Sequence, residues 1–293
     1  MPKLWRLHRH DADRVHSLSR AASVPPVVAQ LLVARGIDDA SRAGEFLDCK
    51  LSALRDPTTL PGVPEATERL MSAVRDGRKI VVYGDYDVDG MTAVAILLQC
   101  LRMLGADAHF YVPRRLEEGY GLNCDALRTL AEQGAKTVVT VDCGIAAVAE
   151  ADAARDAGLE LIVTDHHEFA ARLPAAAALV HPRLPGTHYP FGGLSGAGVA
   201  FKLAWALCQS ADGAKRVSPR MREFLLGAVG LAALGTVADV VPLLDENRVL
   251  VQHGLASLKQ GSGLGVQALL KGADLHAKER LAADDIGFAL APR

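Results

Sequence analysis

The sequence Lys79-Ile80-Val81-Val82-Tyr83 runs directly into Gly84-Asp85-Tyr86-Asp87-Val88-Asp89-Gly90, and a helical pattern follows from about Thr92. A short β-branched run, then glycine and polar residues, then a helix is typical of a parallel strand and the helix that crosses back over its sheet. We therefore expect a buried strand over 80–83, with three aspartates at its carboxyl end.

The same alternation of short apolar runs and Ala/Leu-rich stretches continues towards residue 210. It predicts an α/β fold in which a doubly wound, mostly parallel sheet is covered by helices. In such sheets ligands bind outside the carboxyl ends of the strands. The expected strands are Ile80–Tyr83, His109–Val112, Thr137–Val141, Leu161–Thr164 and Ala178–Val180, with helices near 92–104, 124–133, 146–157 and 196–209.

Three segments are expected along the chain. Residues 1–75 form a helical N-terminal preface interrupted by prolines, and residues 76–245 form the α/β catalytic domain. Residues 246–293 form a helical connector and the start of a second domain, so we expect the chain to be truncated there. The helices expected in the C-terminal part are Met221–Leu234, Glu246–Lys259 and a segment near 280–290.

Composition indicates a globular protein of about two domains. Hydrophobic residues make up 50% and charged residues 23% of the 293 positions. The formal net charge of −2 argues against a uniformly basic protein that coats nucleic acid through its phosphates. We therefore expect any contact with DNA at a local basic patch.

The sequence also bears on the compartment. The five cysteines are scattered and include no C-x-x-C pair, which argues against a zinc site and favours a reducing environment. The N-terminus lacks the apolar segment of a secretory signal. The uncharged stretch from Phe224 to Ala238 is shorter than the roughly 20 residues of a membrane helix. We expect a cytoplasmic protein that does not associate with membranes.

Asp85, Asp87 and Asp89 crowd one turn after the first strand. Like charges at this spacing repel one another unless a cation compensates, and clustered carboxylates bind hard divalent cations. A solvated acidic turn is the simpler alternative. A calcium-binding EF-hand loop is excluded, because the position that needs a glutamate is Ile96.

Further polar groups follow two later strands. Asp142 comes after the third strand, and Asp165-His166-His167 comes after the fourth. One histidine can bind metal through a ring nitrogen while the other faces a substrate phosphate, and the aspartate can orient a ring. A helix N-cap at Asp142 and a surface pair of histidines are the alternatives that stay open.

Asp239 is the single charge in the apolar passage Leu234–Leu243. A buried unpaired carboxylate is costly, so we expect a metal ion or an arginine as its partner. Carboxylates and imidazole together suit Mn²⁺ and, less exclusively, Mg²⁺. The number of groups exceeds the ligands of one ion, which predicts a two-metal site that hydrolyses a phosphoester.

These motifs resemble the DHH phosphoesterase superfamily, whose name corresponds to Asp165-His166-His167. The stretches 112–122, 193–198 and 236–242 are similar to those of the bacterial RecJ single-strand exonucleases. The resemblance implies that Asp85 is an additional motif carboxylate, that Asp165 supports the ligands without touching metal and that His167 binds phosphate. It implies as metal ligands Asp87, Asp89, Asp142, His166 and Asp239.

The resemblance further implies a 5′→3′ exonuclease that uses Mn²⁺ or Mg²⁺ and acts on single-stranded DNA in recombination and repair. Its partners would be single-stranded DNA, a single-strand-binding protein and a helicase. Two alternatives stay open. One is a related phosphoesterase that cleaves short oligonucleotides or cyclic dinucleotides, and the other is a non-catalytic replication scaffold with the same fold.

Two further groups are candidate DNA contacts. Arg114 and Arg115 could bind the DNA backbone, and Tyr120 could stack on a base. A solvated loop is the alternative for all three. The backbone N–H groups at Ser195 and Gly196 could bind phosphate at the start of a helix, or Ser195 could simply cap that helix.

Overall fold

The β-branched runs form one five-stranded parallel sheet in the computed structural model, which describes residues 11–114, 119–260 and 263–293. All five expected strands are confirmed, with small shifts in the bounds of the second and fourth. They are β1 (Ile80–Tyr83), β2 (Ala108–Tyr111), β3 (Thr137–Val141), β4 (Glu160–Thr164) and β5 (Ala178–Val180).

The order of the strands creates a crevice at the carboxyl edge of the sheet. The spatial order is β2-β1-β3-β4-β5, so the chain leaves β1 for one side of the sheet and then returns to the other side at β3. Such a reversal is the point at which doubly wound sheets bind ligands. Tyr83 of β1 pairs with Thr140 of β3, so the turns that follow these two strands emerge next to each other.

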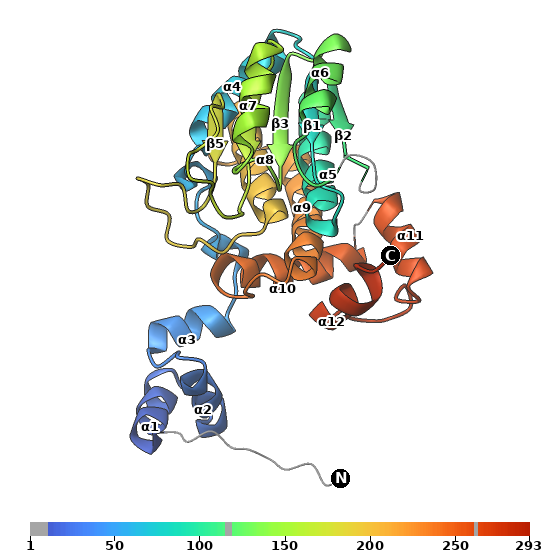
Figure 1. The fold of residues 1–293 in the computed structure, drawn as a ribbon. Coiled ribbons are helices and arrows are strands. Elements are labelled where there is room, and N and C mark those ends of the chain that lie inside the picture. The colour runs from blue at the N-terminus through green and yellow to red at the C-terminus, as the bar shows by residue number, and fades with distance from the viewer. Residues whose placement is uncertain (1–10, 115–118, 261–262) are drawn as a thin grey trace, which may run out of the picture. The chain divides into compact units, whose positions relative to one another are not determined.

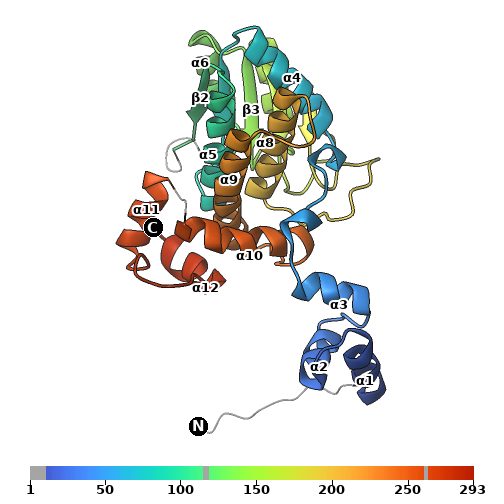
Figure 2. The same ribbon diagram turned by 180° about the vertical axis from the view of Figure 1, so that it is seen from behind.

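Helices cover both faces of the sheet (Figures 1 and 2). On one face, α6 and α7 pack on the apolar side chains of β1, β3 and β4. On the other face, α4, α5, α8 and α9 form a second layer in which α5 contacts both α8 and α9. The bounds are α4 (Val63–Arg75), α5 (Val88–Met103), α6 (Cys124–Glu132), α7 (Val148–Asp156), α8 (Gly196–Asp212) and α9 (Pro219–Ala238). The predicted doubly wound α/β fold is therefore confirmed.

The C-terminal part is helical, as expected. The expected helices near 246–259 and 280–290 correspond to α10 and to the pair α12 and η3, where η3 is a π-helix. Leucines from α9, α10 and α11 join residues of η3 in one apolar cluster. The bounds are α10 (Asp245–Gln260), α11 (Leu264–Gly272), α12 (Ala283–Asp285) and η3 (Ile286–Leu290).

Helix α9 is longer than expected and is long and apolar enough to cross a membrane by length and composition alone. Half of its apolar window is buried inside the protein, where the helix contacts α5, α8 and α10. This is the packing of a core helix, so α9 is weak evidence for a membrane span.

The chain forms two compact units, Met1–Ala53 and Leu54–Arg293, so it divides earlier than the expected boundary at residue 75. The reason is α4, which contacts α8 and β5 and thus belongs to the sheet unit. In the first unit, α1 (Ala12–Ala21), α2 (Pro26–Ala34) and α3 (Ala40–Leu47) enclose a small apolar core, and η1 (Leu51–Ala53) ends the unit. The segment 246–293 lies in the same compact unit as the sheet.

Candidate metal centre

The turn after β1 places three carboxylates at the crevice. Asp85 is fully buried and accepts a hydrogen bond from the backbone N–H of Tyr86 at 2.7 Å. Asp87 is the N-cap of α5 and accepts the N–H of Gly90 at 2.9 Å. Because of this cap, α5 begins about one turn earlier than expected, and Asp89 lies within its first turn. Burial raises the pKa of Asp85.

Asp89 is held by the N-terminus of α8. Its Oδ2 accepts the backbone N–H of Gly196 at 2.6 Å, and its Oδ1 accepts that of Ala197 at 2.9 Å. The side chain is 1% exposed. Burial raises the pKa of Asp89 to about 8, and the carboxylate of Asp142 contributes to the increase. The free N–H groups and the dipole of α8 thus stabilise a buried negative charge.

Two glycines allow these carboxylates to approach the helices closely. A Cβ atom on Gly235 would lie 2.3 Å from Oδ1 of Asp89. A Cβ atom on Gly196 would lie 2.4 Å from Oδ1 of Asp142. Any larger residue at either position would displace a carboxylate of the centre.

Asp142 follows β3 with a left-handed backbone, at a φ of 62°. The conformation is rare for residues other than glycine and is often found at functional sites. The alternative of a helix N-cap is wrong, because the N-cap of α7 is Ala147. Burial raises the pKa of Asp142 to about 9, and Asp87 contributes to the increase. Oδ1 of Asp142 is buried without a hydrogen-bond partner among the described residues.

The imidazole of His166 lies at the centre of the cluster. Its Nε2 atom is 3.0 Å from Oδ1 of Asp142, 3.6 Å from Oδ2 of Asp239 and 3.8 Å from Oδ2 of Asp89. This nitrogen is also buried without a hydrogen-bond partner in the described part of the chain. Atoms from the first turn of α5 and from the ends of β3, β4 and α9 therefore converge on one point.

His167 has a different environment. Its Nδ1 lies 2.8 Å from Oδ1 of Asp165, and its Nε2 lies 3.2 Å from the hydroxyl of Tyr120. The hydrogen bond to Asp165 raises the pKa of His167 to about 9, which favours the imidazolium. Asp165 also accepts the backbone N–H groups of both histidines and of Ile145. Burial would raise the pKa of Asp165, but the hydrogen bonds from His167 and these N–H groups lower it overall.

Asp239 is the C-cap of α9. Its side chain is 23% exposed, which makes it more accessible than Asp89 and Asp142, the other two carboxylates beside His166. Burial nevertheless raises its pKa. The sequence predicts a metal ion or an arginine as its partner. Among the described residues the imidazole of His166 lies beside this carboxylate, with Nε2 3.6 Å from Oδ2, and no arginine takes that place.

The donor atoms fit a divalent cation. Asp89, His166 and Asp239 form one group whose ligand atoms lie within 4.8 Å of one another, and Asp142 with His166 and His167 forms a second group of the same kind. Buried polar atoms without partners are rare in folded proteins and frequently mark an ion. Oxygen and imidazole donors together suit Mn²⁺ and Mg²⁺.

The structure describes two of the three candidate DNA contacts, Tyr120 and Arg114. The ring of Tyr120 packs edge-on against Tyr86 and His167, and 57% of the residue is exposed, so the structure brings Tyr120 to the centre. Arg114 is exposed after β2. Arg115 lies outside the described residues.

The phosphate interpretation of Ser195 and Gly196 needs correction. Ser195 is fully buried and caps α8 by accepting the N–H of Gly198. The N–H of Gly196 already binds Asp89. The helix-cap alternative therefore describes Ser195, and the N-terminus of α8 binds a carboxylate of the protein in place of a phosphate.

Sequence reasoning missed a buried ionic cluster that joins α8 and α10. Nζ of Lys202 lies 2.5 Å from Oε1 of Glu246, and both side chains are fully buried. Glu246 also accepts hydrogen bonds from the hydroxyl of Tyr189 and from the backbone N–H of Arg55. The signal was available, because Lys202 is the one charge in the otherwise apolar stretch from 196 to 209.

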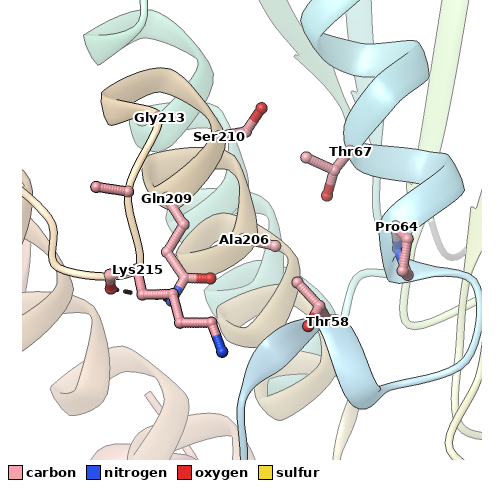
Figure 3. Close-up of a pocket in the computed structure, with 9 residues that line it drawn as sticks. Thr58, Pro64, Thr67, Ala206, Gln209, Ser210, Gly213 and Lys215 are labelled. Atoms are coloured by element: carbon pink, nitrogen blue, oxygen red, sulfur yellow. Dashed lines mark hydrogen bonds between the residues drawn. The ribbon is translucent and has the colours of Figure 1, made fainter.

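A pocket of about 320 Å³ lies at the opposite end of α8 (Figure 3). Residues of α4, such as Thr67, face residues of α8, such as Ser210, across it. Since α8 has 17 residues, it is about 25 Å long and separates this pocket from the carboxylates at its N-terminus. The pocket is therefore not part of the metal centre.

The match to a protein family agrees with this geometry. Residues 79–232 match the model of the DHH family, N-terminal domain, which is more than half of the 293-residue chain. The chain belongs to the DHH family. The matched segment of this DHH-family chain contains β1 to β5 and all the residues of the centre except Asp239.

Several curated relatives of this DHH-family chain are single-stranded-DNA-specific exonucleases named RecJ. The protein of Bacillus subtilis (strain 168) is 43% identical over 291 residues, which is 99% of this chain and 35% of the relative. The protein of Escherichia coli (strain K12) is 38% identical over 301 residues, which is 100% of this chain and 50% of the relative. The chain thus spans between a third and a half of these relatives.

Solved structures of similar proteins contain metal. A RecJ exonuclease bound to manganese is 39% identical with a TM-score of 0.70, over 83% of this chain and 58% of that chain. RecJ from Thermus thermophilus in complex with Mn²⁺ is 35% identical with a TM-score of 0.78, over 98% of this chain and 39% of that chain.

Proposed function

We propose that this chain is the catalytic part of a metal-dependent exonuclease that degrades single-stranded DNA in the 5′→3′ direction during recombination and repair. The observation that carries the proposal is the convergence of Asp89, Asp142 and Asp239 on Nε2 of His166. The similarity to RecJ exonucleases, two of them bound to manganese, supports both the activity and the metal.

The proposed ligands of Mn²⁺ or Mg²⁺ are Asp87, Asp89, Asp142, His166 and Asp239, with Asp85 as an additional carboxylate. When bound, a pair of such ions activates water and stabilises the attacking and leaving oxygens of a phosphoester. The raised pKa values of Asp89 and Asp142 reflect crowded, buried carboxyl groups that gain from a cation. The hydrogen bonds from α8 fix the orientation of Asp89.

His167 is the proposed ligand of the scissile phosphate. Its Nδ1 is bonded to Asp165, so the protonated ring presents its Nε2–H on the side of Tyr120. A cation held in this way can donate a charge-assisted hydrogen bond to a phosphate oxygen. Tyr120 and Arg114 would contact the nucleotide and the DNA backbone beside it.

We further propose the cytoplasm as the compartment, with a single-strand-binding protein and a helicase as partners. The five cysteines form no disulfide in the described part of the chain, which fits a reducing environment. The two partners are inferred from the resemblance to the exonuclease family.

The decisive experiment measures hydrolysis by the purified 293-residue chain with Mn²⁺, Mg²⁺ or chelator. The substrates are a long single strand labelled at either end, the same sequence as a duplex, a dinucleotide and a cyclic dinucleotide. We expect metal-dependent release of nucleotides from the 5′ end of the single strand. Preference for a dinucleotide would favour the related phosphoesterase, and binding of DNA without any hydrolysis would favour the scaffold.

The variants Asp89→Ala and His166→Ala test whether the centre performs the reaction. We expect both to abolish metal-dependent hydrolysis while the circular dichroism spectrum is retained. His188→Ala is the matched control, since His188 is exposed and lies in a loop outside the cluster. Hydrolysis that survives in both centre variants would refute the assignment.

A further inference from the structure

Val240 combines two unusual features. It has a φ of 60°, and 86% of its surface is exposed. Left-handed backbone is strained for any residue with a Cβ atom and is rarest for β-branched residues. The position directly follows Asp239, the C-cap of α9, where glycine or asparagine usually stands. The chain therefore keeps a strained, exposed apolar residue where a strain-free polar one would fit.

The loop that carries Val240 is anchored. Asn247 is fully buried, and its Nδ2 donates to the carbonyl of Pro242 at 3.1 Å and to that of Gly193 at 2.6 Å. These two bonds join the loop after Asp239 to the loop before α8. The exposure of Val240 is thus a property of an ordered segment.

The position of Val240 beside the centre indicates what it contacts. Asp239 precedes it, and Oδ2 of Asp239 lies 3.6 Å from Nε2 of His166. Val240 therefore follows a carboxylate of the centre directly along the chain, and its exposed side chain is accessible to a nucleotide bound there. Strain that is retained at a functional site is commonly offset by a contact that function requires.

We propose that the side chain of Val240 contacts the apolar face of the sugar or base of the nucleotide bound at the metal centre. This inference rests on the proposed function. Leu244, which is 52% exposed at the end of the same loop, extends the apolar surface. The contact positions the substrate and takes no part in the bond cleavage, so its loss affects binding of the strand and leaves the chemical step intact.

The test compares Val240→Asn with the unaltered chain in steady-state hydrolysis of a single strand with Mn²⁺. Asparagine tolerates left-handed backbone and lacks the isopropyl group. We expect KM to rise about fivefold with kcat unchanged, the effect of losing one apolar side-chain contact. We also expect the melting temperature to rise by about 1–3 °C as strain is relieved.

Two controls separate the contact from the strain. Val240→Ile keeps the β-branched apolar surface and should leave KM unchanged. Asp274→Gly relieves the same conformation at the same position after α11, with a φ of 56°, and should stabilise the chain without altering KM. An unchanged KM in Val240→Asn, with an active unaltered chain, overturns this inference alone. An unaltered chain that hydrolyses no strand overturns the proposed function and the inference with it.

Discussion

Nε2 of His166 lies 3.0 Å from Oδ1 of Asp142, and both atoms are buried without a hydrogen-bond partner among the described residues. The two residues follow adjacent parallel strands, β4 and β3, so the register of the sheet brings them together. Two electron-pair donors that face each other without a hydrogen bond are arranged as ligands of a cation.

Removal of either donor should therefore impair metal binding more than folding. We expect Asp142→Asn and His166→Gln each to weaken Mn²⁺ binding by more than the roughly 10–100-fold that loss of an outer partner of a ligand costs. Asp142→Asn should also leave the metal-free chain at least as stable as before, because it removes like-charge repulsion. Isothermal titration with Mn²⁺ and thermal unfolding measure the two effects. Equal Mn²⁺ affinity in the variants would contradict a metal centre at this position.

The stability of the metal-free chain should fall as the pH rises. Burial raises the pKa of Asp89 to about 8 and that of Asp142 to about 9 in the folded chain, against an ordinary value of about 3.9. Folding therefore favours the protonated forms, and stability is lost progressively between about pH 4 and about pH 9. His167, with a pKa raised to about 9, contributes in the same direction above its ordinary value.

Metal should reverse this dependence, because the ligands must be deprotonated to bind it. We expect the increase in melting temperature caused by Mn²⁺ to grow from about pH 6 to about pH 8, and Mn²⁺ binding to release protons. Calorimetry in buffers of different ionisation enthalpy measures that release. A metal-induced increase in melting temperature that becomes smaller from pH 6 to pH 8 would contradict this prediction. Asp142→Asn should make the stability of the metal-free chain depend less on pH.

Gly235→Ala should disrupt the centre from within α9. The added Cβ would lie 2.3 Å from Oδ1 of Asp89 and 2.5 Å from Oγ1 of Thr92, so one of these groups must move. Overpacking of this kind costs about 1–3 kcal/mol of the free energy of unfolding. We expect weaker Mn²⁺ binding in addition, since Asp89 is a proposed ligand.

Gly227 supplies a matched control in the same helix. A Cβ on Gly227 would meet nothing within 4 Å. Gly227→Ala should therefore stabilise the chain by up to about 1 kcal/mol through helix propensity and leave Mn²⁺ binding unchanged. Urea unfolding and Mn²⁺ titration of both variants make the comparison, and identical behaviour of the two would count against the close packing of Asp89 on α9.

Lys202→Met should destabilise the sheet unit. It leaves the carboxylate of Glu246 buried with Arg55 as its remaining cation, whose Nη1 lies 3.4 Å from Oε2. Loss of one partner of a buried pair costs about 3–5 kcal/mol, and the nearby guanidinium places the expected loss at about 3 kcal/mol. The double variant Lys202→Met/Glu246→Gln should recover part of the lost free energy of unfolding. Urea unfolding measures both changes, and a loss no larger than the roughly 0–1 kcal/mol of an exposed pair would contradict the prediction.

The strands and the junctions after them could be predicted from the sequence for a local reason. Five short β-branched runs are each bounded by glycine or polar residues, and parallel strands carry all their carboxyl ends to one edge. That rule alone brings Asp85, Asp142 and His166 to the same crevice. The family assignment follows from the same stretches, because the motifs lie within them.

The environment of each group depended on residues distant in sequence. Asp89 binds the N–H groups of Gly196 and Ala197, which lie more than 100 residues away, so no local pattern predicts those bonds. One of these bonds occupies the N–H of Gly196, which the sequence offered as a candidate phosphate contact. The boundary between the two units also moved, because α4 packs on α8 and β5 in the tertiary structure.

The sequence by itself determined the parallel sheet, its helices and the chemical types of the candidate metal ligands, because these depend on periodicity and on residues next to each strand. The tertiary structure alone decided which groups touch. The convergence on His166, the close packing permitted by Gly235 and the Lys202–Glu246 pair all arise from contacts between separate elements. Such contacts depend on the packing of the whole core. They join residues that are distant in the sequence, so no local sequence pattern predicts them.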